Sequence, residues 1–108
     1  MSVMTIAKAE KLVPAPTWSA MPGYKRVSDF DGGAGAVLIM DAATIIEDPM
    51  VTVCIEWQTD VKPDGTVGPT LESVKLTTGD DSTYIESKQL AHVVFILCHA
   101  AVLAGVVR

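Results

Sequence analysis

The clearest pattern in the chain is a strict alternation of apolar and polar side chains across residues 50–59. The apolar members fall at every second position: Val51, Val53, Ile55 and Trp57. Because successive side chains of a β-strand point to opposite faces, this segment is predicted to be a strand with one apolar and one polar face. A similar alternation across residues 71–78, which follows a Pro-Asp-Gly turn at residues 63–65, predicts a neighbouring antiparallel strand.

Four earlier segments are also predicted to be extended, because each is short and largely apolar or bounded by turn residues. They cover residues 4–7, 11–18, 24–30 and 36–46. Pro14 and Pro16 have no backbone donor, so a strand at 11–18 must lie at a sheet edge or end at the prolines. The Asp-Gly-Gly sequence at residues 31–33 is typical of a hairpin turn.

The end of the chain is predicted to be one long helix over residues 83–107. Thr83 stands three residues before Glu86, as in a capping box, and Asp81 and Ser82 are alternative caps. The predicted fold class is therefore α+β. A single domain over residues 1–108 would contain an antiparallel β-sheet of five or six strands within residues 3–78, followed by the C-terminal helix.

This helix is expected to lie between the subunits of a homodimer. Residues 90–107 contain no Lys, Arg, Asp or Glu, and a helix that is apolar on all sides must be buried on all sides. One small subunit can hardly surround it. The stretch just reaches the length of a membrane span, but His92 and His99 within it, a lone flanking Arg108 and the lack of Trp or Tyr argue against a membrane partner.

The composition supports an interface and gives no sign of catalysis. Charged residues make up 19% of the chain, against about 25% in typical soluble proteins, so part of the apolar surface is expected to contact a partner. The net charge of −5 argues against a general nucleic-acid binder, although it leaves room for a local basic face. Residues 1–12 lack the apolar stretch of a signal peptide, so the chain is expected in a reducing cytoplasm.

The residue types that often carry chemistry have structural explanations here. His92 and His99 are seven positions apart, too far along a helix to share one metal ion, and are interpreted as interfacial histidines. Cys54 and Cys98 lie in separate apolar runs and are interpreted as buried thiols. The aspartates at the turn of residues 29–31 usually bond their own backbone. No enzyme activity, metal or cofactor is predicted.

The polar face of the predicted strands remains the most informative surface. It displays the alternate side chains of residues 52–58 and 73–77, with Lys25 and Arg26 expected nearby. A solvated sheet face is the ordinary explanation, and a binding surface is the other. An alternative function is a small oligomeric α+β protein that binds a small molecule in a pocket between helix and sheet. Such a pocket would be lined by Trp57, His92 and Cys98.

Three runs, together with the order of the elements, resemble the coat (capsid) protein of single-stranded RNA bacteriophages, the levivirus-like family. Residues 11–18 (KLVPAPTW) look like the family's second strand, which ends in small residues and prolines before an aromatic residue. Residues 51–57 (VTVCIEW) are similar to its fifth strand, in which a Thr-x-Lys-x-Glu pattern faces the RNA. Residues 71–77, followed by Asp-Asp-Ser at 80–82, resemble its sixth strand and the turn before the first helix.

The resemblance implies a structural protein of the virion, assembled in the cytoplasm of a bacterial host. In the implied interlocked homodimer, sheets pair edge to edge and each C-terminal helix crosses the partner's sheet. The dimers self-assemble into an icosahedral shell around single-stranded RNA, and an RNA hairpin binds the inner sheet face. Carried over by position, the RNA-binding residues are Thr52, Cys54, Glu56 and Ser73, and Lys75 joins them from the alternation alone. Cys54 departs from the pattern, which has Lys there.

Overall fold

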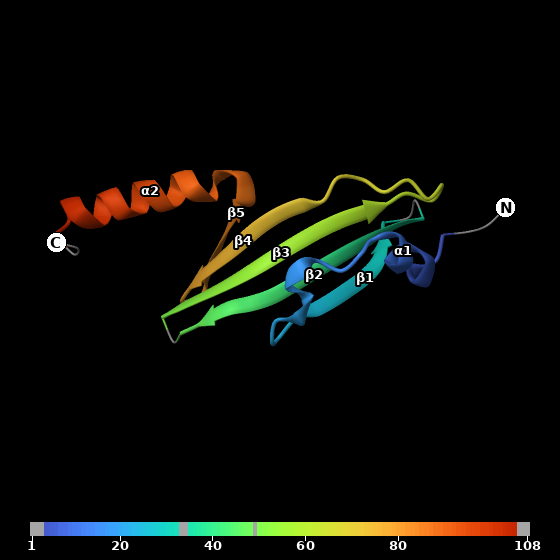
Figure 1. Cartoon of the computed structure of the whole chain (residues 1–108), viewed down its shortest axis with the longest axis horizontal. Helices are drawn as coiled ribbons and strands as arrows, with labels where there is room; N and C mark the ends of the chain where they lie inside the picture. The colour runs from blue at the N-terminus through green and yellow to red at the C-terminus, as the bar shows by residue number, and fades with distance from the viewer. Residues whose placement is uncertain (1–3, 33–34, 49, 106–108) are drawn as a thin grey trace.

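The computed structural model describes residues 4–32, 35–48 and 50–105, which form an antiparallel sheet between short N-terminal helices and a C-terminal helix (Figure 1). The N-terminal elements are α1 (Ile6–Leu12) and the 3-10 helix η1 (Thr17–Ala20). The later elements are β1 (Lys25–Asp31), β2 (Ala36–Glu47), β3 (Val51–Val61), β4 (Leu71–Thr78), β5 (Asp81–Glu86) and α2 (Ser87–Leu103). The predicted α+β class, a sheet followed by a C-terminal helix, is confirmed.

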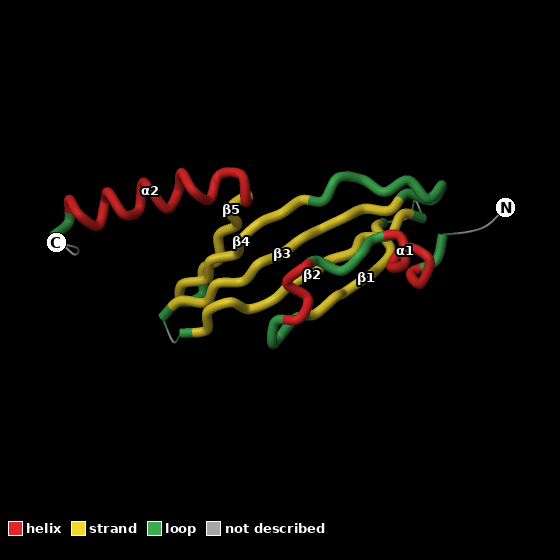
Figure 2. Tube along the Cα trace, in the orientation of Figure 1, coloured by secondary structure: helices red, strands yellow, loops and turns green. Residues whose placement is uncertain are grey.

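The five strands follow one another across the sheet in sequence order, and each is antiparallel to its neighbour (Figure 2). Antiparallel neighbours can be joined by very short turns, and Gly79 and Asp80 connect β4 to β5. Gly79 has a φ of +61°, a left-handed conformation that glycine adopts without a steric penalty. β1 and β5 are the two edge strands of this sheet.

Residues 4–20, which we call the strap, lie on one face of the sheet, and we call this the covered face. The buried core joins three strap residues to three strand residues: Met4, Ala9, Val13, Val37, Ile39 and Val61. The alternate residues of β2, such as Leu38 and Met40, belong to the opposite face, which we call the open face. The core therefore lies beneath the strap and leaves part of the covered face without a layer above it.

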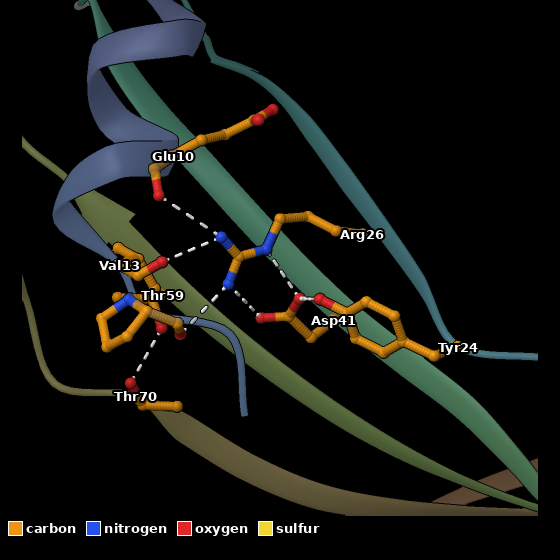
Figure 3. A network of polar contacts seen from close by, with 8 residues as sticks. Glu10, Val13, Tyr24, Arg26, Asp41, Thr59 and Thr70 are labelled. Atoms are coloured by element: carbon orange, nitrogen blue, oxygen red, sulfur yellow. Dashed lines mark hydrogen bonds and ion pairs between the residues drawn. The ribbon is translucent and has the colours of Figure 1, made fainter. Parts of the chain in front are cut away.

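A partly buried ion pair attaches the strap to the sheet (Figure 3). The Arg26 guanidinium donates to both carboxylate oxygens of Asp41, from Nε at 2.7 Å and from Nη2 at 3.0 Å. The same guanidinium donates to the strap carbonyls of Val13 at 2.8 Å and Pro14 at 3.2 Å. The hydroxyl of Tyr24 donates to Asp41 as well. Arg26 thus satisfies backbone acceptors just beyond the end of α1, and its bonds to Asp41 raise its own pKa.

α2 extends away from the sheet along the long axis of a molecule that measures 63 × 26 × 24 Å (Figure 1). It packs against β4 and β5. None of its described residues is buried, and Phe95 and Leu97 are 69% and 57% exposed. In the single chain, the most apolar element of the sequence is therefore surrounded largely by solvent.

The strands predicted at residues 4–7 and 11–18 are wrong, because the strap contains α1, an irregular proline segment and η1. Ile6, Ala9 and Val13 recur at spacings of three and four, which places them on one side of a helix. The Thr5 side chain caps this helix by accepting a hydrogen bond from the Lys8 amide at 3.1 Å. The strand that the phage resemblance suggested at 11–18 is therefore not formed.

The predicted boundary between sheet and helix is also wrong, because residues 81–86 form β5 and α2 begins at Ser87. The strands consequently extend past residue 78, and the capping box of Thr83 and Glu86 is not formed. Glu86 precedes α2 directly but makes no side-chain capping bond. Residue 3, Gly33 of the predicted hairpin turn and the predicted helical residues 106–107 lie outside the described residues.

Candidate nucleic-acid interface

The open face brings together all five residues predicted to contact RNA. Thr52, Cys54 and Glu56 alternate along β3, and Ser73 and Lys75 alternate along β4. In the antiparallel register, Cys54 pairs with Lys75 and Glu56 pairs with Ser73. Directly paired residues share a face and lie in side-chain contact distance, so these four form a compact group, with Thr52 next to it along β3. All five are partly buried.

Hydrogen bonds tie this group to the sheet. The Thr44 hydroxyl lies 3.6 Å from the Cys54 sulfur, and the Ser73 hydroxyl donates to the Glu56 carbonyl at 3.4 Å. One carboxylate oxygen of Glu56 is buried and makes no hydrogen bond to the described residues. A buried acceptor without a donor is unfavourable, so this oxygen is a polar group that the single chain leaves unsatisfied.

Tyr84 is the residue of this surface that sequence reasoning missed, because β5 was expected to be helical. Tyr84 pairs with Lys75 across the β4–β5 ladder, and the Lys75 ammonium lies 5.6 Å from the centre of the Tyr84 ring. The ring is 56% exposed. An exposed aromatic ring beside an ammonium group can stack on an unpaired base while the cation meets a phosphate. A polar alternation over Ser82, Tyr84 and Glu86 is the sequence signal that would have identified it.

The open face as a whole is acidic. Its ammonium groups are those of Lys25 and Lys75. Arg26 was also expected near this face, but it lies on the covered face. Its carboxylates come from four of the five strands, β1, β2, β3 and β5: Asp29, Asp31, Glu47, Glu56, Asp60 and Glu86. Acidic side chains repel phosphate, so nucleic acid has its most favourable contact around Lys75 and Tyr84.

The most acidic part of the open face lies around Asp31 and Asp60. Burial and the neighbouring Asp31 carboxylate raise the pKa of Asp60. In contrast, hydrogen bonds from Thr66 lower the pKa of Asp64 in the following turn. The repulsion between Asp31 and Asp60 marks the end of the open face that is least suited to a polyanion.

The covered face continues beyond the strap as an apolar surface, which we call the apolar half. Register relates its members in pairs across β2 to β5, and all of them are partly or fully exposed. They are Ile46, Val53, Ile55, Val74, Leu76 and Ile85. The register of β2 shifts between Thr44 and Ile46, and this bulge returns Ile46 to the covered face. Apolar surfaces of this kind are typical of contacts with another molecule.

The alternative small-molecule pocket is not formed by the described residues. Trp57 lies on the covered face with its ring 5.6 Å from that of Trp18, and it lines a cavity of about 230 Å³ beneath the strap. His92 and Cys98 are exposed on α2, and His99 stacks on Phe95 at 6.4 Å. Both cysteines are free thiols. Cys98 is exposed and Cys54 is partly buried, so the predicted burial is wrong for Cys98 and only partial for Cys54 in the single chain.

Within the described ranges, no group of three or more His, Cys, Asp or Glu side chains is arranged to hold a metal ion. Over the same ranges, none of the helices combines the length and the apolar character needed to cross a membrane. Comparisons of the chain with models of protein families, with curated proteins and with solved structures find no match. The function is therefore argued from the two faces of the sheet and from α2.

Proposed function

We propose that the chain is the coat protein of a single-stranded RNA virus of bacteria, which forms an interlocked homodimer and assembles into an icosahedral shell around the RNA. The observation that carries the proposal is the presence of two incompletely buried apolar surfaces in one chain: the exposed α2 and the partly buried apolar half of the covered face. Each surface needs a partner, and a second copy of the chain supplies both.

The dimensions of the two surfaces agree with this exchange. α2 contains 17 residues, which corresponds to about 25 Å of helix. A sheet of five strands spaced by about 4.8 Å measures about 20 Å between its outer strands. A helix that leaves β5 can thus cross the whole covered face of a neighbouring sheet. Its apolar side chains would then lie on Ile46, Val53 and Leu76 of the partner chain instead of in water.

The edge of the sheet provides the second part of the dimer contact. β5 is an edge strand, so its outer row of backbone donors and acceptors has no strand beside it among the described residues. Antiparallel pairing of β5 with a second β5 would satisfy these groups and would bring the two copies of α2 near the opposite sheets. The resemblance implied that the helix follows β4 directly, and it did not include β5 as the edge strand.

The RNA would contact the open face around Cys54, Glu56, Ser73, Lys75 and Tyr84. These residues offer a hydroxyl donor, a carboxylate acceptor, one ammonium group and one stacking ring. Single-stranded RNA is typically bound through such stacking and edge contacts. Because one ammonium group neutralises few phosphates, we expect affinity to fall with salt along a shallow slope.

Light scattering coupled to size-exclusion chromatography, followed by electron microscopy, tests the shell proposal. We expect no monomer of 11.4 kDa at micromolar concentration, and we expect closed particles of uniform diameter in the microscope. A stable monomer, or a discrete dimer that forms no particles under any ionic condition tried, contradicts the proposal.

The role of the open face is tested by the RNA content of the particles. Lys75→Ala removes the ammonium group near Tyr84, so we expect less RNA per particle without loss of assembly. Glu56→Lys replaces a carboxylate by an ammonium group on the same face, so we expect more RNA. The ratio of absorbance at 260 and 280 nm and a direct RNA assay measure both effects. Equal RNA content in the two variants would mean that another surface binds the RNA.

A further inference from the structure

A cavity of about 230 Å³, which we call the strap cavity, separates the proline segment of the strap from the sheet. One wall is the segment between α1 and η1. The other wall comes from β2, β3 and the chain that joins β3 to β4. The volume is below the roughly 300–1,000 Å³ that is typical of small-molecule sites. The strap cavity therefore suits one or two side chains better than a free ligand.

The strap cavity offers an occupant mainly apolar contacts. The Asp41 carboxylate on its wall already accepts hydrogen bonds from Arg26 and Tyr24 (Figure 3). The hydroxyls of Thr59 and Thr70 hydrogen-bond to each other at 2.8 Å. The rest of the lining is largely aliphatic, proline and indole surface: Val13, Pro14, Ala15, Pro16, Trp57 and Val67. Because a polar group would lose water here without finding a free partner, the favoured occupant is an aliphatic side chain.

Trp57 joins the strap cavity to the apolar half. Ile55 and Trp57 are successive covered-face residues of β3, with Ile55 in the apolar half and Trp57 on the cavity wall. The two surfaces are therefore continuous. In the proposed dimer, the partner's α2 lies on the apolar half, so its far end approaches the strap cavity along the same surface.

The length of α2 matches the distance to the strap cavity. If two β5 strands pair antiparallel over their full length, the partner's α2 starts opposite Asp81, which pairs with Thr78 of β4. Glu72, at the level of Trp57, lies six residues before Thr78, or about 20 Å along β4. From the partner's β5 to β3 there are three strand spacings, or about 14 Å. The diagonal is about 25 Å, which equals the length of the 17-residue α2.

The end of α2 carries the side chain that suits this cavity. Leu103 is the last residue of α2 and is 76% exposed, and the preceding Val102 is 57% exposed. α2 extends away from its own sheet, so these side chains have no apolar contact with the strap of their own chain (Figure 1). An aliphatic side chain gains free energy when it leaves water for an apolar cavity.

We propose that the strap cavity receives the Leu103 side chain at the end of the partner's α2. The inference rests on the proposed dimer and adds an anchoring point for each helix. By two-fold symmetry, each dimer contains two such contacts. The hydrogen bonds of Arg26 to Asp41 and to the strap then have a role in assembly, because they hold the strap in place over the cavity.

Cross-linking between copies tests where the end of α2 lies. Cys54→Ala and Cys98→Ala remove both natural thiols from the full chain. In that background, Val67→Cys places a thiol on the cavity wall and Leu103→Cys places one at the end of α2. We expect mild oxidation to convert most of this variant into a covalent dimer on non-reducing electrophoresis.

Two matched controls accompany the cross-link. Leu71→Cys with Leu103→Cys offers a thiol that is at least as accessible, since Leu71 is 66% exposed, but Leu71 pairs with Gln58 on the open face. The single variant Leu103→Cys reports any link between the two helix ends. We expect both controls to give at most a tenth of the covalent dimer that the variant with thiols at positions 67 and 103 gives.

The affinity of the dimer provides a second measurement. Leu103→Ala empties the strap cavity twice in each dimer, so we expect dissociation at concentrations at least tenfold higher, measured by analytical ultracentrifugation. Leu103→Met retains an apolar side chain of similar length and should match the unmodified chain. Absence of the cross-link in a chain that is dimeric by ultracentrifugation overturns the inference and leaves the dimer proposal standing. If the unmodified chain is a monomer, both are wrong.

Discussion

Arg26 is the residue on which the attachment of the strap to the sheet depends most. Its guanidinium joins a buried carboxylate to three carbonyls of the strap, and lysine could not reproduce this geometry because it has one donor centre. The Asp41 side chain is 4% exposed, so it has little access to water if the arginine is removed. The pair thus contributes through its hydrogen bonds as well as through its charge.

Substitutions of Asp41 and Arg26 should lower the free energy of unfolding by different amounts. Asp41→Ala leaves the guanidinium without its carboxylate, and we expect the free energy of unfolding to fall by about 3 kcal/mol. Arg26→Lys keeps the charge and loses the bidentate contact, so we expect a loss of about 1–2 kcal/mol. Urea unfolding at fixed protein concentration measures both. Lys25→Ala, on the adjacent exposed position of β1, is the control, with an expected change below about 0.5 kcal/mol.

Asp60 should make the stability depend on pH in the opposite sense to Asp64. Because the pKa of Asp60 is raised in the folded chain, its stabilising contribution is present below the unfolded pKa of about 3.9 and is lost as the pH rises through the folded pKa. Asp60→Asn should therefore stabilise the protein at pH 7 and have little effect at pH 3. The pKa of Asp64 is lowered, so Asp64→Asn should destabilise at pH 7 and matter less at pH 3. Denaturant midpoints at the two pH values measure this, and changes of equal sign would contradict it.

At the scale of single residues, the sequence predicted positions on a face better than it predicted contacts. The alternation along β3 placed Thr52, Cys54 and Glu56 together, because a period of two is a local property of the strand. The bond between Arg26 and Asp41 could not be predicted in this way. The two residues are 15 positions apart, and the contact depends on the register of the β1–β2 hairpin.

At the scale of elements, the strands with alternating apolar and polar side chains were predicted, and the elements without a regular pattern of this kind were not. β2, β3 and β4 correspond to predicted segments because apolar side chains dominate one of their faces. β5 was missed because it is a short edge strand with one aliphatic residue, Ile85, and its Asp-Ser-Thr sequence has the composition of a helix cap. α1 was missed because its seven residues contain few large apolar side chains.

The cap of α1 gives the clearest test at this scale. Thr5→Ala removes the side-chain acceptor of the Lys8 amide, and we expect the strap to be destabilised by about 1 kcal/mol. Thr5→Ser keeps the acceptor and should restore most of this loss. Hydrogen exchange of the α1 amides reports on the strap directly, since local opening is faster than global unfolding. Equal exchange rates in the two variants would show that the cap contributes nothing.

At the scale of the whole molecule, the shortage of charge corresponds to apolar surface that the chain cannot bury alone. The buried core consists of a few residues beneath the strap, while α2 is exposed and the apolar half is only partly buried. A folded chain of this kind gains stability from any partner that covers these surfaces, and that stability rises with protein concentration. The melting temperature of the unmodified chain should therefore increase with concentration if the dimer is the stable form.

Leu97 separates the contribution of the partner from that of the chain itself. Leu97 is 57% exposed in the single chain, so Leu97→Gln should change the stability of a monomer by less than about 0.5 kcal/mol. In the dimer, the glutamine would lose water at an apolar contact, at a cost of about 1–3 kcal/mol for each of two equivalent sites. We therefore expect the dimer to dissociate at concentrations at least tenfold higher than for the unmodified chain.

Leu97→Met retains the apolar contact and should match the unmodified chain, and analytical ultracentrifugation distinguishes the variants. If Leu97→Gln dissociates at the same concentration as Leu97→Met, α2 does not lie in the dimer contact.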